Sequence, residues 1–284
     1  VGFGGISVGG LPLNKKHFSL LSNVDHICAT HDLGKNAFSK GQPDFGEELA
    51  DDLLRVIYKH GADRIAAFIT EPLAGSTGVL IPPKGYLERI RGICTEHDIL
   101  LIFDEVITGF GRLGTPFAAD YFGVEPDMIT CAKGLTSGTV PMGAVMVKQV
   151  IYNAFQDGDP KVIDLFHGYT YSAHPMAAAA LIATLDVYRE DGLFEHANER
   201  SSYWENALHS LKGTDPIIDI RNLGLIAGIE MEAKEGKPGT RGYDVFTDAF
   251  QPVLDEKDES DRLFIQLYHM NIRDIELEGK HVLE

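Results

Sequence analysis

Three residues whose side chains could do chemistry each follow a short apolar run of the sequence. Asp104 comes directly after I-L-L-I-F (99–103), Lys133 comes after D-M-I-T-C-A (127–132), and Glu71 ends a third run in the same way. Each run has the length and composition of a buried strand. Polar residues at the carboxyl ends of parallel strands converge on one crevice. We therefore expect these three side chains to lie near one another.

A lone aspartate or lysine in such a place has a simpler explanation. An aspartate at a strand end often caps a helix, and a lysine usually carries its ammonium to water. An aspartate and a lysine on neighbouring strand ends, in a mostly apolar crevice, favour a pyridoxal phosphate site instead. There the lysine amine forms a Schiff base with the cofactor aldehyde, and the carboxylate keeps the pyridine nitrogen protonated.

Other kinds of site fit the sequence less well. No pair of ligands with metal-binding spacing accompanies Asp104 and Lys133, and His167 and His174 alone would make a weak site, so no metal is expected. A dinucleotide-binding site would need G-x-G-x-x-G after a strand, and residues 2–7 do not match it. A serine hydrolase is not expected either.

The composition is that of an ordinary globular protein, 44% hydrophobic and 24% charged. The net charge of -17 argues against a nucleic-acid partner, because phosphate binding needs a basic patch. No apolar stretch approaches the roughly 18 residues of a membrane span, so no membrane partner is expected. The three cysteines, Cys28, Cys94 and Cys131, show no metal-ligand spacing, and their odd number fits a reducing cytoplasm.

Strand-like and helix-like segments alternate along most of the chain. The expected strands are 64–70, 99–103, 127–132 and 143–147, and the expected helices are 48–59, 84–97, 175–190 and 194–211. This order predicts an α/β fold, a mostly parallel sheet with helices on both faces. Further strands at 216–220 and 225–230 indicate a second, partial α/β domain. We place the domains at 1–200 and 201–284, with an atypical tail from about 250.

Longer motifs around these residues resemble the class III aminotransferases, which are fold-type I pyridoxal-phosphate enzymes. F-D-E-V-I-T-G-F-G-R-L-G (103–114), followed by P-D-M-I-T-C-A-K-G (126–134), is similar to the signature of that family. E-P-L-A-G-S-T-G-V-L-I-P-P-K-G-Y-L (71–87) and F-H-G-Y-T-Y-S-A-H-P (166–175) are similar to its omega-amino acid:pyruvate (beta-alanine:pyruvate) branch. Ser76 stands where the ornithine and 4-aminobutyrate branch carries a glutamate, which favours the pyruvate-using branch.

The resemblance implies a role for four residues. Lys133 would be the catalytic residue, bound to the cofactor as a Schiff base and moving the proton between substrate and cofactor. Asp104 would pair with the pyridine nitrogen, and Val106 would pack on a face of the ring. Thr170 would contact the cofactor phosphate across a subunit interface. The implied cofactor is pyridoxal 5'-phosphate, and the implied assembly is a homodimer or dimer of dimers with shared sites.

The implied activity is transamination of an omega-amino acid or amine, such as beta-alanine, with pyruvate as acceptor, giving alanine and an aldehyde or oxo acid. Members of the family extend further at the N-terminus, so we expect this chain to be a fragment lacking that part. A non-catalytic fragment or degenerate relative with the same fold is the alternative, and a pyridoxal-phosphate decarboxylase or aminomutase is a minor one. Arg112 and Arg221 are expected to have structural roles. Arg273 cannot be mapped onto the arginine that would bind the substrate carboxylate, so no substrate-binding residue is identified.

Overall fold

The computed structural model describes residues 3–159, 161, 165, 167–237, 239–255 and 271–275. The chain divides into two compact units. Unit 1 comprises Val1–Asp52, Leu73–Tyr86 and Ser201–Glu284, and unit 2 comprises Leu53–Pro72 and Leu87–Arg200. One border between the units falls after Arg200, where the sequence placed the domain boundary. Unit 1, however, also includes the earlier segments Val1–Asp52 and Leu73–Tyr86. The division into domains 1–200 and 201–284 stays a prediction.

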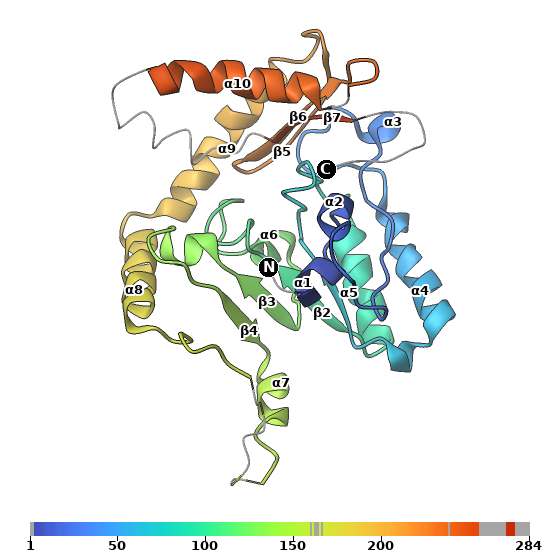
Figure 1. The fold of residues 1–284 in the computed structure, drawn as a ribbon, viewed down its shortest axis with the longest axis vertical. Helices are drawn as coiled ribbons and strands as arrows, with labels where there is room; N and C mark the ends of the chain where they lie inside the picture. Colours follow the sequence, from blue (N-terminus) through green and yellow to red (C-terminus); the bar gives the residue numbers. More distant parts are fainter. Residues whose placement is uncertain are drawn as a thin grey trace. The chain divides into compact units, whose positions relative to one another are not determined.

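Unit 2 is built on a four-stranded sheet with the order β1-β2-β3-β4 (Figure 1). Its strands are β1 Ala67–Thr70, β2 Leu100–Asp104, β3 Met128–Cys131 and β4 Ala144–Val147. β1, β2 and β3 run parallel, and β4 pairs antiparallel with β3. The prediction of an α/β fold with a mostly parallel sheet is therefore confirmed.

Helices precede or follow these strands, and the expected helices at 48–59, 84–97, 175–190 and 194–211 are all present, while the short helices at 118–122 and 149–154 were not expected. They are α4 Asp52–His60, α5 Tyr86–Glu96, α6 Ala118–Phe122, α7 Gln149–Ala154, α8 Pro175–Glu190 and α9 Leu193–His209, with short 3-10 turns η2 Ala62–Arg64 and η3 Lys133–Thr136. α8 begins with a proline in its first turn, and His174 Nδ1 accepts a hydrogen bond from the amide of Met176 at 3.3 Å. α9 contains residues of both units.

The core of unit 2 includes residues of α5 and of the inner strand β2. Ile90, Ile93 and Cys94 of α5 are fully buried, as are Leu101 and Phe103 of β2. The helix expected at 84–97 is confirmed as α5. β2 and β3 each have a hydrogen-bonded neighbour on both sides, and at the carboxyl end of β2 Asp104 pairs with Thr130 of β3.

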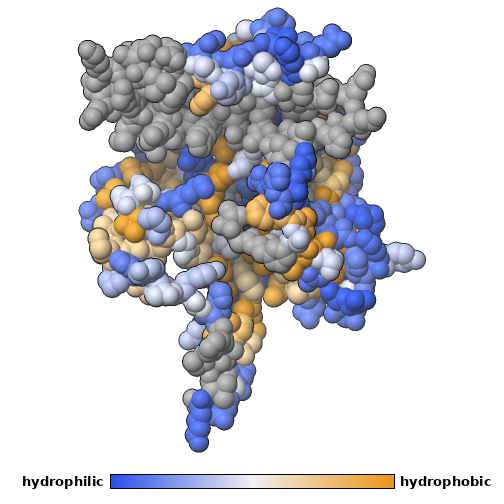
Figure 2. Space-filling view, in the orientation of Figure 1, coloured by the Kyte–Doolittle hydropathy of each residue, from blue (hydrophilic) through white to orange (hydrophobic). Residues whose placement is uncertain are grey.

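The last strand of this sheet is far more open than the sequence indicates. Val145, Met146 and Val147 of β4 are exposed to 62%, 40% and 40%, and Val150 of α7 is exposed to 72%. β4 leads directly into α7 in Figure 1, and Figure 2 shows hydrophobic residues at the surface in that part of the view. The apolar composition of residues 143–147 predicted the strand β4. The exposure of its side chains could not be predicted in the same way, because it depends on which other elements cover them.

Unit 1 contains a three-stranded sheet of order β5-β6-β7, formed by β5 Ile217–Leu223, β6 Ile226–Glu232 and β7 Asn271–Ile275. β5 and β6 are antiparallel neighbours, and β6 and β7 are parallel. The helices are α1 Phe3–Val8, α2 Pro12–Lys15, α3 Leu33–Asn36, the 3-10 turn η1 Glu47–Asp51 and α10 Thr240–Asp255. A small core joins Leu208, Ile220 and Ile229.

Much of the tail predicted to be atypical from about 250 lies outside the described residues. α10 continues to Asp255, and β7 adds a strand that the sequence did not predict. Among the residues that the structure describes, no helix is long and apolar enough to cross a membrane.

Candidate active site

Asp104 is the last residue of β2, and two donors hold its carboxylate. Oδ1 accepts hydrogen bonds from the backbone amide of Val106 and from Thr130 Oγ1 of the neighbouring strand, both at 3.1 Å. Oδ2 has no protein donor in the described part of the chain. The side chain is half-buried. Asp104 is thus fixed in orientation while one oxygen stays available to a ligand that carries an N–H group.

Lys133 follows β3 after one residue and begins the 3-10 turn η3. Its backbone has a φ of +45°, a left-handed conformation that is strained for a residue with a side chain. Its carbonyl accepts a hydrogen bond from the amide of Gly138 at 3.2 Å. Within the described residues, its ammonium makes no ion pair or hydrogen bond with the protein.

The mostly apolar crevice expected around Lys133 is not present among the described residues of this structure. β3 is buried at Cys131, but Lys133 itself is exposed. The physical reason is local: the chain turns into η3 directly after the strand, and no described element covers the side chain there.

The strand directions bring the three predicted strand-end residues to one edge of the sheet. Thr70 of β1 pairs with Phe103 of β2, and Asp104 of β2 pairs with Thr130 of β3, in parallel registers. Glu71, Asp104 and Lys133 therefore leave the sheet at the same edge, on consecutive strands. This is the arrangement that the sequence predicted, although their chemical roles remain predictions.

Val106 and Thr170 lie in different surroundings. Val106 is half-buried, and its amide is one of the two donors to Asp104. Thr170 is exposed, beyond the β4–α7 region, and its hydroxyl has no hydrogen bond among the described residues. The proposed role of Thr170 needs a second subunit, and it stays a prediction.

Sequence reasoning missed Glu105, which follows Asp104 and is completely buried. Its carboxylate accepts hydrogen bonds from the amides of Ala118 at 2.6 Å and Ala119 at 2.8 Å, and from Thr108 Oγ1 at 2.8 Å. Burial raises the pKa of Glu105 more than these hydrogen bonds lower it. Glu105 thus ties the end of β2 to the start of α6, and the signal that could have revealed it was an acid inside an apolar segment.

G-I-S-V-G at residues 5–9 has the G-x-S-x-G spacing of the nucleophile motif of serine hydrolases, with Ser7 at its centre. Ser7 lies inside helix α1 rather than on a turn between strand and helix, and it is buried. Its hydroxyl accepts a hydrogen bond from the amide of Leu21 at 3.0 Å. Ser7 therefore has the position of a structural serine.

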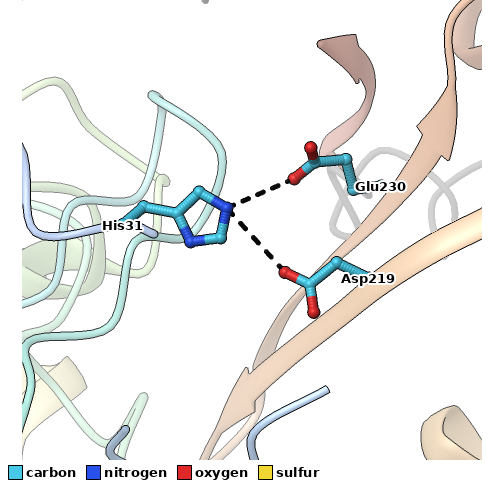
Figure 3. Close-up of side chains that lie close together, drawn as sticks. All are labelled: His31, Asp219 and Glu230. Carbon is cyan, nitrogen blue, oxygen red and sulfur yellow. Dashed lines mark ion pairs between the residues drawn. The ribbon is translucent and has the colours of Figure 1, made fainter. Parts of the chain in front are cut away.

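Unit 1 contains a buried cluster that resembles a metal site by spacing alone. Ligand atoms of His31, Asp219 and Glu230 lie within 4.8 Å of one another. Figure 3 shows both carboxylates facing His31 Nε2, at 3.9 Å for Asp219 and 3.6 Å for Glu230. Arg221 Nη1 donates hydrogen bonds to both carboxylates and lies 3.1 Å from His31 Nε2. The guanidinium therefore already fills the position of a cation.

The same arginine also binds a loop of unit 1. Its Nε and Nη2 donate hydrogen bonds to the carbonyl of Gly78 at 3.2 and 2.9 Å. Burial alone would raise the pKa of Glu230, but the nearby His31 and Arg221 hold it below its usual value. Arg221 thus has the structural position that the sequence predicted, whereas Arg112 is exposed.

Comparison with known proteins identifies the relatives of this chain. A sequence profile described as aminotransferase class-III matches residues 15–252. An omega-aminotransferase of Caulobacter vibrioides is 56% identical over 93% of this chain and 64% of its own length. A beta-alanine--pyruvate aminotransferase of Pseudomonas aeruginosa is 47% identical over 86% of this chain and 55% of its own length.

Solved structures agree with these sequence relatives. The omega transaminase of Pseudomonas jessenii in complex with PMP superposes with a TM-score of 0.77 at 33% identity, covering 86% of this chain and 55% of that one. A thermostable (S)-enantioselective omega-transaminase of Thermomicrobium roseum gives a TM-score of 0.74 at 36% identity, covering 83% and 52%. The chain spans roughly half to two thirds of the length of the relatives that it matches.

Proposed function

Because the chain belongs to the class III aminotransferases, a family of pyridoxal-phosphate-dependent enzymes, we propose that it serves transamination. The amino group of an omega-amino acid or amine, such as beta-alanine, is transferred to pyruvate, giving alanine and an aldehyde or oxo acid. The observation that carries this proposal is the placement of Asp104 and Lys133 at one edge of the sheet, on adjacent parallel strands. Relatives named for omega-amino acid and beta-alanine donors support the choice of substrates.

The residues present suit pyridoxal phosphate. The cofactor supplies an electron sink that stabilises negative charge on the substrate carbon. The unpartnered Oδ2 of Asp104 would accept a hydrogen bond from the pyridine nitrogen and hold it protonated, while Val106 would pack on the ring. Lys133 Nζ, unpaired in the described structure, would hold the cofactor aldehyde covalently and would move a proton to and from the substrate carbon.

We further propose a homodimer, or a dimer of dimers, in which Thr170 binds the cofactor phosphate of the partner subunit. The exposed apolar side chains of β4 and α7 support an interface on unit 2, since contiguous exposed apolar surface marks interaction sites. The free state of Cys28, Cys94 and Cys131 supports a cytoplasmic location.

A non-catalytic relative that keeps the fold is the second candidate. The exposure of Lys133 and of Thr170 favours it, because a cofactor bound through exposed residues competes with water. The two candidates differ in one measurable property, the covalent capture of the cofactor.

The test is Lys133→Ala. The wild-type chain with added pyridoxal phosphate is expected to show a visible absorbance band, and borohydride is expected to fix the cofactor mass on the peptide that contains Lys133. Lys133→Ala should abolish both signals, because Lys133 is the one lysine in the segment between β3 and β4. Lys148→Ala is the matched control: it removes a lysine of unit 2 that lies beside Asp127 at the opposite edge of the sheet. A wild-type chain that stays colourless would support the non-catalytic candidate.

A further inference from the structure

The backbone around Lys133 is held in a strained conformation by contacts that the proposed chemistry does not use. Lys133 has a φ of +45°, and Ser137, which ends the same turn, has a φ of +50°. Backbone strain at a reactive residue persists only when the surroundings determine it. The question is therefore which groups of unit 2 fix the turn η3.

Phe110 lies directly against Gly134, the residue after Lys133. A Cβ atom on Gly134 would come within 2.7 Å of Phe110 Cβ, so only glycine permits this approach. The ring of Phe110 packs edge-on against Phe117 at 5.3 Å and is stacked on Tyr188 at 5.9 Å, with 18° between the planes. These aromatic side chains support the turn from the side, but they make no directional bond to it.

Tyr188 makes the directional bond. Its hydroxyl, carried on α8, donates a hydrogen bond of 2.7 Å to the carbonyl of Gly134. The same carbonyl accepts the amide of Ser137 at 3.3 Å, and the amide of Gly138 donates to the carbonyl of Lys133 at 3.2 Å. Burial raises the pKa of Tyr188, although Arg112 opposes the shift, so the hydroxyl keeps its proton and remains a donor.

We propose that Tyr188 is a positioning residue for Lys133: its hydroxyl anchors the carbonyl of Gly134, and this anchor holds the strained turn that presents the lysine amine beside Asp104. Tyr188 contacts the turn from a helix more than fifty residues later in the sequence. Asp104, in contrast, is placed near the turn because β2 pairs with β3. The position of the amine relative to the carboxylate thus depends on the contact between α8 and η3. The inference deepens the proposed function and rests on it for its chemical meaning.

The first test needs no cofactor. Tyr188→Phe keeps the aromatic stacking and removes only the hydroxyl. Loss of one hydrogen bond is expected to speed hydrogen exchange of the Ser137 and Gly138 amides about fivefold. Tyr203→Phe, which removes the hydroxyl of a tyrosine 74% exposed on α9, is the matched control and should leave these amides unchanged. Wild-type exchange at both amides in Tyr188→Phe would overturn the inference.

The second test measures the presentation of the amine. Tyr188→Phe is expected to weaken pyridoxal phosphate capture on Lys133 about fivefold, followed by absorbance and by borohydride-fixed mass on the Lys133 peptide. A merely structural tyrosine would lower the unfolding temperature while the capture stayed at its wild-type value, and that result would also overturn the inference. If the wild-type chain takes up no cofactor, the proposed function fails, and the exchange experiment alone then supports or overturns the role of Tyr188.

Discussion

Each unit of the molecule buries a glutamate almost completely, and the two units balance that charge by different means. Glu105 of unit 2 accepts hydrogen bonds from two backbone amides and one hydroxyl, and no ion pair to it is found among the described residues. Glu230 of unit 1 is paired with Arg221 and lies 3.6 Å from His31. Burial raises the pKa of Glu105, whereas the cationic partners lower that of Glu230.

This difference shows how the type of partner decides the direction in which the pKa of a buried acid shifts. Neutral donors at a helix start compensate part of the desolvation of a carboxylate, and an arginine compensates more of it. The price is dependence on a single side chain, because Arg221 serves Asp219 and Glu230 together. Glu230 Oε1 has no hydrogen-bond partner in the described part of the chain, so unit 1 has little reserve if Arg221 is lost.

The largest expected effect comes from removing the shared cation. Arg221→Met leaves two buried carboxylates without their main partner, and we expect the free energy of unfolding to fall by about 3–5 kcal/mol. Urea unfolding of the purified chain measures it. Lys84→Met is the control, because it breaks an exposed pair with Asp44 at 2.6 Å and should cost less than about 1 kcal/mol. Equal losses for the two variants would contradict the central role of Arg221.

Removing the buried carboxylate of Glu105 in unit 2 should lower the free energy of unfolding somewhat less. Glu105→Met has a similar volume but leaves the amides of Ala118 and Ala119 and the hydroxyl of Thr108 without an acceptor. We expect a loss of about 2–4 kcal/mol, since each unsatisfied buried donor is costly. The exposed Glu96 provides the control, and Glu96→Met should change the urea midpoint little. A loss no greater than that of the control would show that α6 finds other acceptors.

The smallest effect is a difference in pH dependence between two glutamine variants. The raised pKa of Glu105 means that its ionisation costs stability as pH rises above the ordinary glutamate value of about 4.3. The lowered pKa of Glu230 means that its contribution is present above that value and is lost as pH falls through its folded pKa. The advantage of wild type over Glu105→Gln should shrink with rising pH, and its advantage over Glu230→Gln should grow.

The test is to measure the free energy of unfolding at several pH values between about 3 and 7, a range that brackets the ordinary glutamate pKa. The slope of interest is the change with pH of the difference between wild type and each variant. Each glutamine variant is compared with wild type at the same pH, so the contributions of the surface carboxylates to the free energy of unfolding cancel. Slopes of the same sign for the two variants would mean that the two burial environments do not differ as described.

Much of the sheet, and the edge at which Asp104 and Lys133 leave it, could be predicted because strand patterns are local in sequence. The apolar runs before Asp104 and Lys133 predicted β2 and β3, and parallel pairing then placed both residues at one edge. The antiparallel direction of β4 could not be predicted, because an apolar strand has the same pattern in either direction. Glu105 and Tyr188 escaped prediction, since their partners lie 13 and 54 residues away.

The sequence by itself determined the family and the strand ends at which Asp104 and Lys133 stand, because strand patterns and motifs consist of neighbouring residues. The tertiary structure decided what surrounds those residues: Lys133 is exposed and strained, and the Tyr188 hydroxyl donates a hydrogen bond to the carbonyl of Gly134 next to it. It also decided that Glu105 and Glu230 have opposite pKa shifts. The physical reason is that burial and hydrogen bonding depend on which distant segments come into contact. No local pattern of residue types records those contacts.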